Sequence, residues 1–96
     1  MFKEVSPVYI NLGSNRSRFE IISEILTVTK NNWTGISKIM NTACLSFRQV
    51  KHYMDLLVKK ELLDMSRDKR WQSYKTSLRG IEFLNSYEQL LNLLNI

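Results

Sequence analysis

The sequence predicts a single α+β domain, mainly helical, with a three-helix core, a two-stranded hairpin and one more helix at the C-terminus. Three observations support this fold class. The chain has 96 residues, enough for one modest hydrophobic core. Apolar residues recur at helical intervals in four segments, and capping patterns that begin with serine precede two of them. Between the third and fourth segments the period changes to that of two short strands.

The N-terminal stretch, residues 1–16, has no clear helical period. Its Val-Tyr-Ile run at 8–10 could form a short strand, and Gly-Ser-Asn at 13–15 indicates a break. We therefore expect an arm or a short strand here. Charges and a proline stand where a signal peptide needs an apolar run, and no stretch reaches the roughly 18 apolar residues of a membrane span. We expect a cytoplasmic protein without membrane contact.

The first helix should begin near Ser17, because residues 17–20 (Ser-Arg-Phe-Glu) have the spacing of a capping box. Its expected apolar face consists of Phe19, Ile22, Ile25, Leu26 and Thr29. Trp33, in the turn that follows, is expected to lock the next element against the core.

A short second helix is expected after Trp33, with Thr34 as its N-cap. Its inward stripe should consist of Ile36, Ile39, Met40 and Ala43. Cys44, the single cysteine, cannot form an internal disulfide, which fits a reducing cytosol. We expect Cys44 to be a small buried hydrophobic residue.

The third helix should begin at a second capping box, residues 46–49 (Ser-Phe-Arg-Gln), and run to about Lys60. Its expected inner side consists of Phe47, Val50, Tyr53, Met54, Leu57 and Val58. Two helices joined by three or four residues, the second opened by serine, have the layout of a helix-turn-helix.

A hairpin follows the third helix. Residues 62–65 and 71–76 are the candidate strands, and the polar residues 66–70 form the expected turn. The segment has no Asn-Gly or Asp-Gly pair, so the sequence does not specify the type of turn. A hairpin in this place is the wing of a winged helix. We expect Trp71 to pack at the base of the wing rather than to stack on a nucleic-acid base, and Tyr74 to lie in the core.

The last helix should start at Thr76 or Ser77 and extend to the C-terminus, with Gly80 allowing close packing against the wing. Its apolar stripe is wider than a lone surface helix requires, and consists of Leu78, Ile81, Phe83, Leu84, Tyr87, Leu90, Leu91, Leu93, Leu94 and Ile96. Leu84, Tyr87, Leu91 and Leu94 have the 3-4-3 spacing of a coiled-coil seam. We therefore expect residues 80–96 to join two copies of the chain. Because fewer than about three heptads are present, the first helix or the arm would have to contribute. The alternative is that this helix packs wholly on its own domain.

Positive charge is concentrated in one third of the chain. Residues 1–45 carry five basic and three acidic side chains, residues 46–79 carry nine and four, and residues 80–96 carry none and two. The net charge is therefore +2, +5 and −2 in the three segments, which sum to the +5 of the whole chain. Such a focus of positive charge favours a polyanionic partner.

The candidate site on the third helix consists of Ser46, Arg48, Gln49, Lys51 and His52. In a helix-turn-helix the N-terminal half of the second helix reaches the base edges. Arg48 and Gln49 carry the donors and acceptors that read guanine and adenine, whereas Lys51 suits phosphates. The unpaired N–H groups at the start of this helix would also suit a phosphate. His52 is either a further DNA contact or an ordinary surface residue.

The wing supplies the second half of the candidate site, Arg67, Lys69 and Arg70. Three cations in four residues at a hairpin tip could follow the DNA backbone or enter the minor groove. Any one of them could equally be part of an ordinary solvated face. The segregated charge together with the helix-turn-helix order predicts binding to double-stranded DNA.

Two segments resemble archaeal winged-helix DNA-binding proteins. Residues 45–57 (LSFRQVKHYMDLL) followed by Leu62 and Leu63 are similar to the recognition-helix segment of that family, and residues 74–84 (YKTSLRGIEFL) to its strand-to-helix signature. The resemblance covers about residues 17–95, and its motifs are moderately specific. It implies a homodimer that binds double-stranded DNA through the recognition helix and wing of each subunit.

Two features depart from that family. Lys60 and Glu61 occupy the turn after the recognition helix, where the family commonly has a glycine. The C-terminal helix stops at Ile96, so that any coiled coil is shorter than in the longest relatives. The resemblance therefore leaves the geometry of the dimer open.

Other function classes are less consistent with the sequence. It has no glycine-rich phosphate loop, no Cys/His ligand set and no histidine beside an obvious nucleophile, so we expect neither an enzyme nor a metal or cofactor site. No small-molecule pocket is evident. An RNA-binding role lacks a set of exposed aromatic residues. The competing hypothesis is a winged helix used for protein contacts, but the preferred one is a transcription regulator or architectural protein on the nucleoid.

Overall fold

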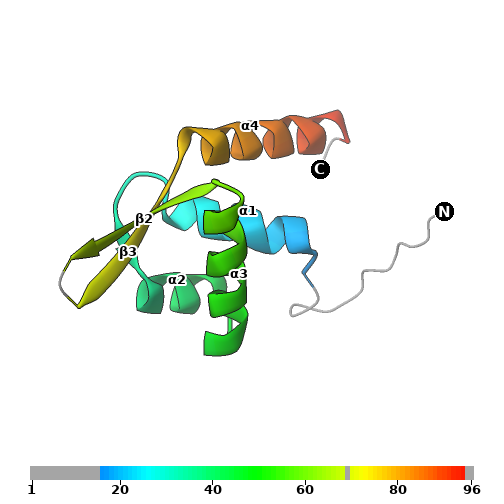
Figure 1. Cartoon of the computed structure of the whole chain (residues 1–96). Coiled ribbons are helices and arrows are strands. Elements are labelled where there is room, and N and C mark those ends of the chain that lie inside the picture. The colour runs from blue at the N-terminus through cyan, green and yellow to red at the C-terminus, as the bar shows by residue number, and fades with distance from the viewer. Residues whose placement is uncertain (1–15, 69, 95–96) are drawn as a thin grey trace.

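The structure, a computed structural model, describes residues 16–68 and 70–94. Along these residues four helices and three strands follow one another (Figure 1): α1 (Arg18–Val28), β1 (Thr34–Gly35), α2 (Ile36–Ala43), α3 (Phe47–Lys59), β2 (Leu63–Asp68), β3 (Trp71–Thr76) and α4 (Leu78–Leu93). The predicted fold class is confirmed, with the helices in the expected order. Residues 1–15 of the arm expected over 1–16 lie outside the described residues, as do Lys69 and Ile96.

Helix α1 begins at the capping box that its sequence predicts. The Ser17 hydroxyl accepts a hydrogen bond from the Glu20 N–H at 3.1 Å, and the Glu20 carboxylate accepts one from the Ser17 N–H at 2.7 Å. These bonds satisfy two N–H groups that no carbonyl within the helix can reach. Further along, Ile22, Ile25 and Leu26 are buried and form the side of the core that α1 contributes.

The turn between α2 and α3 is built on Cys44. Its backbone is left-handed, with φ 55° and ψ 51°. The Cys44 N–H donates to Asn41 O at 3.3 Å and the Leu45 N–H to Met40 O at 3.0 Å, which is the Schellman pattern of helix ends. Leu45 is thereby turned into the core, at 7% exposure, whereas the Cys44 side chain is exposed. The expectation of a buried thiol was wrong, because the residue that reverses the chain direction points outward.

Helix α3 has the predicted capping box and the predicted inner side. The Ser46 hydroxyl accepts from the Gln49 N–H at 3.2 Å, and the Gln49 side-chain oxygen accepts from the Ser46 N–H at 2.9 Å. Val50, Met54 and Leu57 are at most 1% exposed. The three residues between α2 and α3 complete the expected helix-turn-helix.

Four large residues that were expected to pack inward, three from the periodicity and Trp33 from its place in a turn, are exposed. They are Phe19, Trp33, Phe47 and Leu78, with exposed fractions of 61%, 50%, 60% and 87%. Each lies in the first turn of a helix or in a connection. Periodicity assigns such residues to a face, but at the end of an element no neighbouring element covers that face. Phe19 still contacts α4, since its ring stacks on that of Phe83 with centroids 6.4 Å apart.

The predicted two-stranded hairpin is present as β2 and β3, and β1 extends it to a three-stranded antiparallel sheet in the order β1-β3-β2. Thr34, expected as a helix N-cap, is a strand residue opposite Tyr74, and Gly35 is the N-cap of α2. On the other side β2 pairs with β3 from Leu63↔Thr76 to Asp68↔Trp71. The strands therefore continue through most of the polar segment that was expected to be a turn.

A buried pair of threonines ties the sheet to α1. The Thr29 and Thr76 hydroxyls lie 2.8 Å apart, and the Thr76 hydroxyl also lies 2.6 Å from Leu26 O, to which it donates. The Thr76 N–H donates to Thr29 O at 2.9 Å. Because these polar groups are buried, each missing bond would cost stability. The end of β3 is thus held at a defined place on the helical core.

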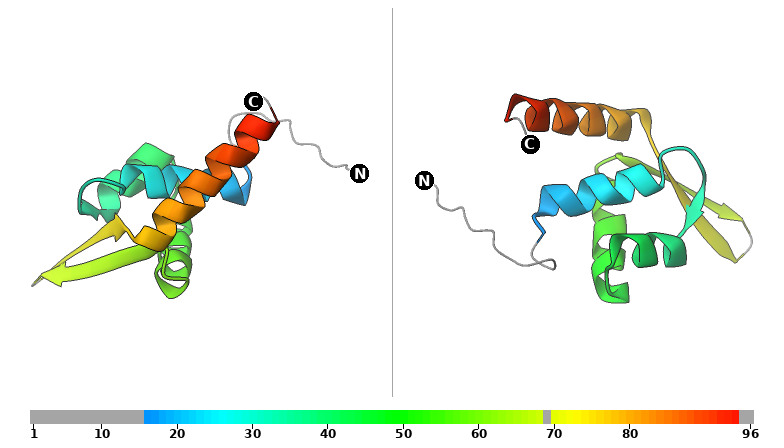
Figure 2. Two further views of the ribbon diagram at one scale, coloured as in Figure 1. Left: turned by 90° about the horizontal axis from the view of Figure 1, so that it is seen from above. Right: turned by 180° about the vertical axis from the view of Figure 1, so that it is seen from behind.

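Helix α4 starts directly after this anchor. The Ser77 hydroxyl accepts from the Gly80 N–H at 3.0 Å and donates to Glu61 O at 2.7 Å. A Cβ on Gly80 would lie 2.3 Å from Leu62 O, so the expected close packing at this glycine is confirmed. Figure 2 shows that α4 lies along one side of α1, while α2 and α3 lie on the other side. The wing points away from the C-terminal end of α4 (Figure 1).

Candidate nucleic-acid interface

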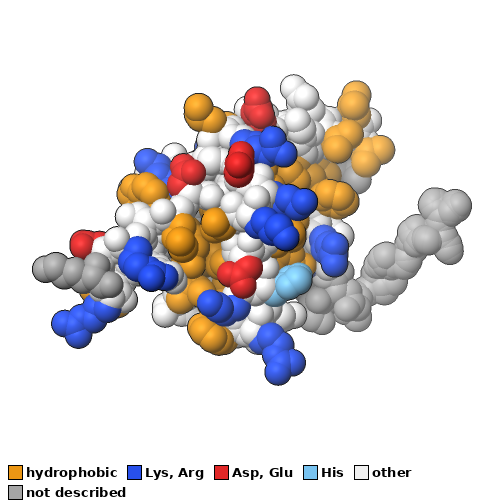
Figure 3. Space-filling model, viewed as in Figure 1, with side chains coloured by type: hydrophobic (Ala, Val, Ile, Leu, Met, Phe, Trp, Pro, Cys, Tyr) orange, Lys and Arg blue, Asp and Glu red, His pale blue; other side chains and the backbone are white. Residues whose placement is uncertain are grey.

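The outward face of α3 carries the polar residues that the sequence singled out. Arg48, Lys51 and His52 are exposed, on the side opposite the buried Val50 and Met54. The His52 ring meets that of Tyr53 edge-on, with centroids 5.6 Å apart. Figure 3 shows Lys and Arg side chains spread over α3 and the wing on one face of the molecule. These side chains can reach a ligand without rearrangement of the core.

The capping box changes the interpretation of Ser46 and Gln49. Both side chains already bond to backbone N–H groups at the start of α3. A glutamine that reads adenine uses its oxygen and its NH₂ group together, and here the Gln49 oxygen is engaged with Ser46. The expectation of unpaired N–H groups at this helix start was therefore partly wrong. Arg48, Lys51 and His52 are the residues of this end that stay available.

The tip of the wing presents arginine and tryptophan side chains. Arg67 and Arg70 are exposed, and Lys69 between the strands lies outside the described residues. Trp71 pairs with Asp68 at the tip end of the hairpin and is 73% exposed. The expectation that Trp71 packs at the wing base was wrong, because the strands extend further than the turn signals suggested. Tyr74 is 5% exposed and lies in the core as expected.

A shallow groove lies between α3 and the wing. It measures about 230 Å³ and is lined by Met54, Asp55, Val58, Lys59, Met65 and Tyr74. Burial raises the pKa of the Tyr74 hydroxyl above its usual value; Asp55 raises it further and Arg67 offsets part of this. The lining of this groove comes from both α3 and the wing, so these two elements lie next to each other.

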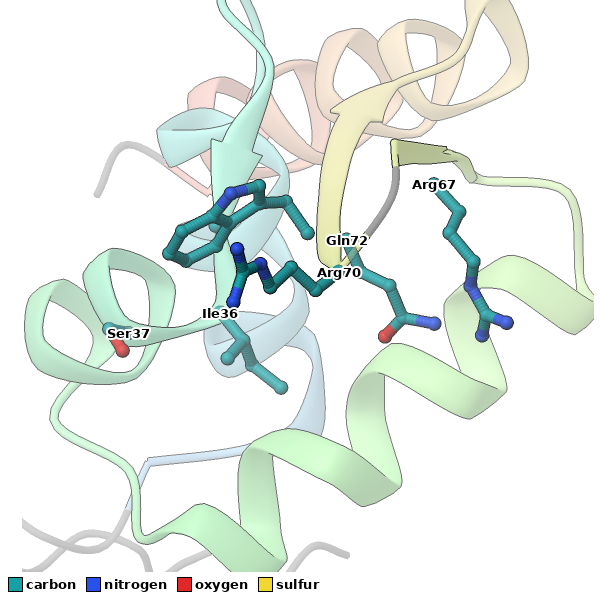
Figure 4. A pocket seen from close by; sticks show the side chains of 7 residues that line it. Ile36, Ser37, Arg67, Arg70 and Gln72 are labelled. Atoms are coloured by element: carbon teal, nitrogen blue, oxygen red, sulfur yellow. The ribbon is translucent and has the colours of Figure 1, made fainter.

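A second hollow lies between the wing and the start of α2, and we refer to it as the wing–α2 cleft. It measures about 600 Å³ and is lined by Gly35, Ile36, Ser37, Arg67, Arg70, Trp71 and Gln72. In Figure 4, Arg70 extends from the wing toward Ile36, and Arg67 and Gln72 point toward the α3 side. The sequence did not indicate this cleft, because it forms only where β1 pairs with β3.

The four residues predicted for a dimer interface differ in their surroundings. Leu84 packs partly against the core, and Tyr87 stacks on Phe83 with centroids 6.2 Å apart. Burial, and to a smaller extent the carboxylates of Glu20 and Glu24 on α1, raise the pKa of Tyr87 above its usual value. Leu91 is half-buried.

Leu94 is exposed, as are Leu90 and Leu93, which lie on the same last turns of the helix. Figure 3 shows hydrophobic side chains gathered at this end of α4. Of the predicted seam, the C-terminal part is thus left uncovered by residues 16–68 and 70–94, and the N-terminal part faces its own domain.

Two other classes of site are not found in residues 16–68 and 70–94. Their His, Cys, Asp and Glu side chains form no group of three or more that could hold a metal ion. None of the helices in the same residues is long and apolar enough to cross a bilayer.

The fold is similar to that of several solved structures. Sso10a-2, a DNA-binding protein from Sulfolobus solfataricus, matches with a TM-score of 0.74 and 21% identity over 83% of each chain. A point mutant of MepR from S. aureus, bound to an oligodeoxyribonucleotide, matches with a TM-score of 0.68 and 11% identity; 80% of this chain aligns with 57% of MepR. The adhesin competence repressor AdcR from Streptococcus pyogenes matches with 0.65 and 16%, over 86% and 67% of the two chains. At these identities the likeness concerns the fold.

A comparison with curated protein sequences found no match. The model of the winged helix-turn-helix family matches residues 15–95, which include all the helices and strands described above. This agrees with the resemblance to archaeal winged-helix proteins in the recognition-helix and strand-to-helix segments. The chain belongs to the winged helix-turn-helix family.

Proposed function

We propose that this protein is a dimeric double-stranded DNA-binding protein, either a transcription regulator or an architectural protein. The recognition helix α3 lies in the major groove, and the wing contacts the backbone or the minor groove. The observation that carries the proposal is the placement of the charge. Arg48, Lys51, Arg67 and Arg70 are exposed on adjoining elements of the fold, within the segment of net charge +5.

The roles of individual residues follow from their chemistry. Arg48 has the bidentate donor geometry that reads the guanine edge. Lys51 and the wing arginines neutralise phosphates. His52 stands one residue further along the same exposed face and suits a backbone contact. Gln49 has a smaller part in base reading, because its oxygen holds the Ser46 N–H.

Two similar structures support DNA as the ligand. Sso10a-2 is described as a DNA-binding protein, and the MepR structure contains a bound oligodeoxyribonucleotide. A pair of recognition helices in one dimer would read two half-sites about one helical turn apart. The exposed leucines at the end of α4 supply an apolar surface through which two copies could join.

The competing hypothesis is a winged helix that binds another protein and no DNA. A titration with labelled duplex DNA from about 50 mM to about 200 mM salt separates the two. For a DNA binder, the logarithm of the binding constant falls linearly with the logarithm of the salt concentration, and the slope reflects the number of phosphates contacted. Absence of binding at low salt contradicts the proposal. The same titration with a single-stranded RNA of equal length tests the alternative of an RNA-binding role.

Two variants test the division of roles. Arg48→Ala should reduce discrimination between the preferred and other duplexes by about 1–3 kcal/mol. Lys51→Ala should weaken all duplexes to a similar extent and lower the salt slope by about one. Arg79→Gln, which removes an equal charge from α4, is the matched control. If all three variants bind like the parent, the placement of the site is wrong.

A further inference from the structure

The wing–α2 cleft has two walls that come from distant parts of the chain. Arg70, Trp71 and Gln72 line it from the wing, and Gly35 and Ser37 from the start of α2. The pairing of β1 with β3, in which Gly35 stands opposite Ser73, holds these walls side by side. The cleft is therefore a fixed part of the fold and needs no ligand to assemble it.

The positive charge of the cleft is not neutralised within the described part of the chain. Its lining contains two arginines and no acidic residue. Arg16–Glu24 is the one salt bridge among residues 16–68 and 70–94, so Arg67 and Arg70 pair with none of the carboxylates described there. Two arginines on one hollow favour an anion with several acceptor oxygens, such as a phosphate.

Trp71 adds a large apolar surface next to these charges. Its side chain is 73% exposed, although burying it within the domain would be favourable. A ligand that suits both Trp71 and Arg70 has an apolar part joined to an anionic part. The sugar–phosphate backbone of DNA has this combination at every nucleotide.

The opposite wall is also compatible with an anion. Ser17, Ser46 and Ser77 each cap their own helix with a side-chain hydrogen bond, whereas α2 starts at Gly35 and has none. Ser37 brings a hydroxyl to the same wall. No side chain caps the start of α2, and the Ser37 hydroxyl can donate a hydrogen bond, so this wall carries no negative charge that would oppose the anion.

We infer that the wing–α2 cleft receives one sugar–phosphate unit of a DNA strand, with Arg70 on the phosphate and Trp71 against the sugar. This rests on the proposed function and adds a third contact surface to α3 and the wing tip. It clamps the backbone beside the groove that α3 enters. The contact carries no sequence information, so it fixes the orientation of the protein on the duplex.

Gly35 allows a test in which folding and binding respond in opposite directions. A Cβ at Gly35 meets nothing within 4 Å and φ is −78°, so larger residues fit. Aspartate and asparagine both favour the N-cap position, so Gly35→Asp and Gly35→Asn should leave the melting temperature equal or higher. Only Gly35→Asp brings a negative charge into the cleft. It should weaken binding to a labelled duplex about tenfold more than Gly35→Asn does.

Trp71 provides a direct spectroscopic readout. In a Trp33→Phe background Trp71 is the single tryptophan, because the chain contains two. Its emission should change when duplex is added at low salt, with the same midpoint as the anisotropy of the labelled DNA. Raising the salt should reverse the change. Arg70→Gln should lower the salt slope by about one, with Arg79→Gln as the charge-matched control outside the cleft.

The outcomes separate this inference from the proposed function. If the parent protein binds no duplex at low salt, the proposed function fails and the inference with it. If the parent binds but Gly35→Asp and Gly35→Asn bind equally well and Trp71 emission stays constant, the inference alone is overturned. A drop in affinity that is accompanied by a lower melting temperature in Gly35→Asp also overturns it, since misfolding would then explain the loss.

Discussion

The two long helices of this domain, α3 and α4, use their apolar residues in opposite ways. α3 has 13 residues and buries Val50, Met54 and Leu57 to 1% exposure or less. α4 has 16 residues, and Gly80 is the one residue it buries fully. Its Leu78, Leu90, Leu93 and the Leu94 that follows are more than half exposed.

The difference indicates where each helix finds its partner. The apolar side of α3 is satisfied inside the chain, so its outward face can be polar, as the proposed contact with DNA requires. Within residues 16–68 and 70–94 the apolar side of α4 is covered mainly along its first half, by α1 and by the close approach of Gly80 to Leu62. The rest of α4 has the composition of an interface, and residues 16–68 and 70–94 offer it no second surface.

Removal of a buried leucine from α3 should give the largest effect. Leu57→Ala should lower the free energy of unfolding by about 3 kcal/mol, since it removes a 1% exposed side chain and leaves a cavity. The same change at Leu78, 87% exposed, should cost less than about 0.5 kcal/mol. Urea denaturation measures both. Equal losses would contradict the contrast between the two helices.

A charge at the exposed end of α4 should separate the proposed dimer without unfolding the domain. Leu94→Glu changes both copies, and loss of two buried leucine side chains would weaken association by about 100-fold or more. Sedimentation velocity over a concentration series gives the dissociation constant. Leu78→Glu, at the other end of the helix, is the control and should associate like the parent. A parent that is monomeric at all concentrations would refute the dimer.

Gly80 tests the contact through which the start of α4 is held. Gly80→Ala would place a Cβ 2.3 Å from Leu62 O and 2.5 Å from Thr76 Cγ2, so that α4 or the wing must shift. We expect a loss of about 2 kcal/mol. Gly35→Ala, whose Cβ has open space, should change stability by less than about 0.5 kcal/mol. Thermal melts of the two variants, followed by circular dichroism, would contradict this packing if they coincided.

A substitution just after the C-terminal end of α3 should have the smallest effect, a gain in the free energy of unfolding. Glu61 has a left-handed backbone with φ 63°, and the Leu62 N–H donates to Leu57 O at 2.8 Å in a second Schellman turn. Glu61→Gly should relieve this conformation and raise the free energy of unfolding by about 0.5–1 kcal/mol. Glu61→Ala keeps the unfavourable φ and should give no gain. A Glu61→Gly variant no more stable than Glu61→Ala would contradict the argument.

Glu61 also illustrates what the family resemblance contributed. The resemblance indicated a glycine at the turn that Lys60 and Glu61 occupy. The structure shows why, because Glu61, the second residue after the end of α3, takes a positive φ there. Cys44 is the corresponding left-handed residue after α2, and no sequence feature pointed to it. A cysteine is expected to be buried from its average behaviour, whereas its exposure here follows from the turn.

Features that depend on a few neighbouring residues could be predicted from the sequence. The capping boxes at Ser17 and Ser46, the inner side of α3 and the existence of the hairpin were predicted correctly, since each depends on side-chain and backbone groups a few residues apart. The exposed basic face of α3 followed from the same periodicity. The assignment of DNA contacts and of the dimer seam to particular residues stays a prediction.

Features that depend on contacts between distant segments were decided only by the tertiary structure. The sequence by itself determined the order of the helices and the hairpin, the starts of α1 and α3 and the concentration of charge in residues 46–79, because these follow from local bonds and composition. The pairing of Thr34 with Tyr74, far apart along the chain, made the third strand and, with it, the wing–α2 cleft. The exposure of Trp71 and of the α4 leucines was decided in the same way. Burial depends on which elements meet, and neither periodicity nor composition specifies that.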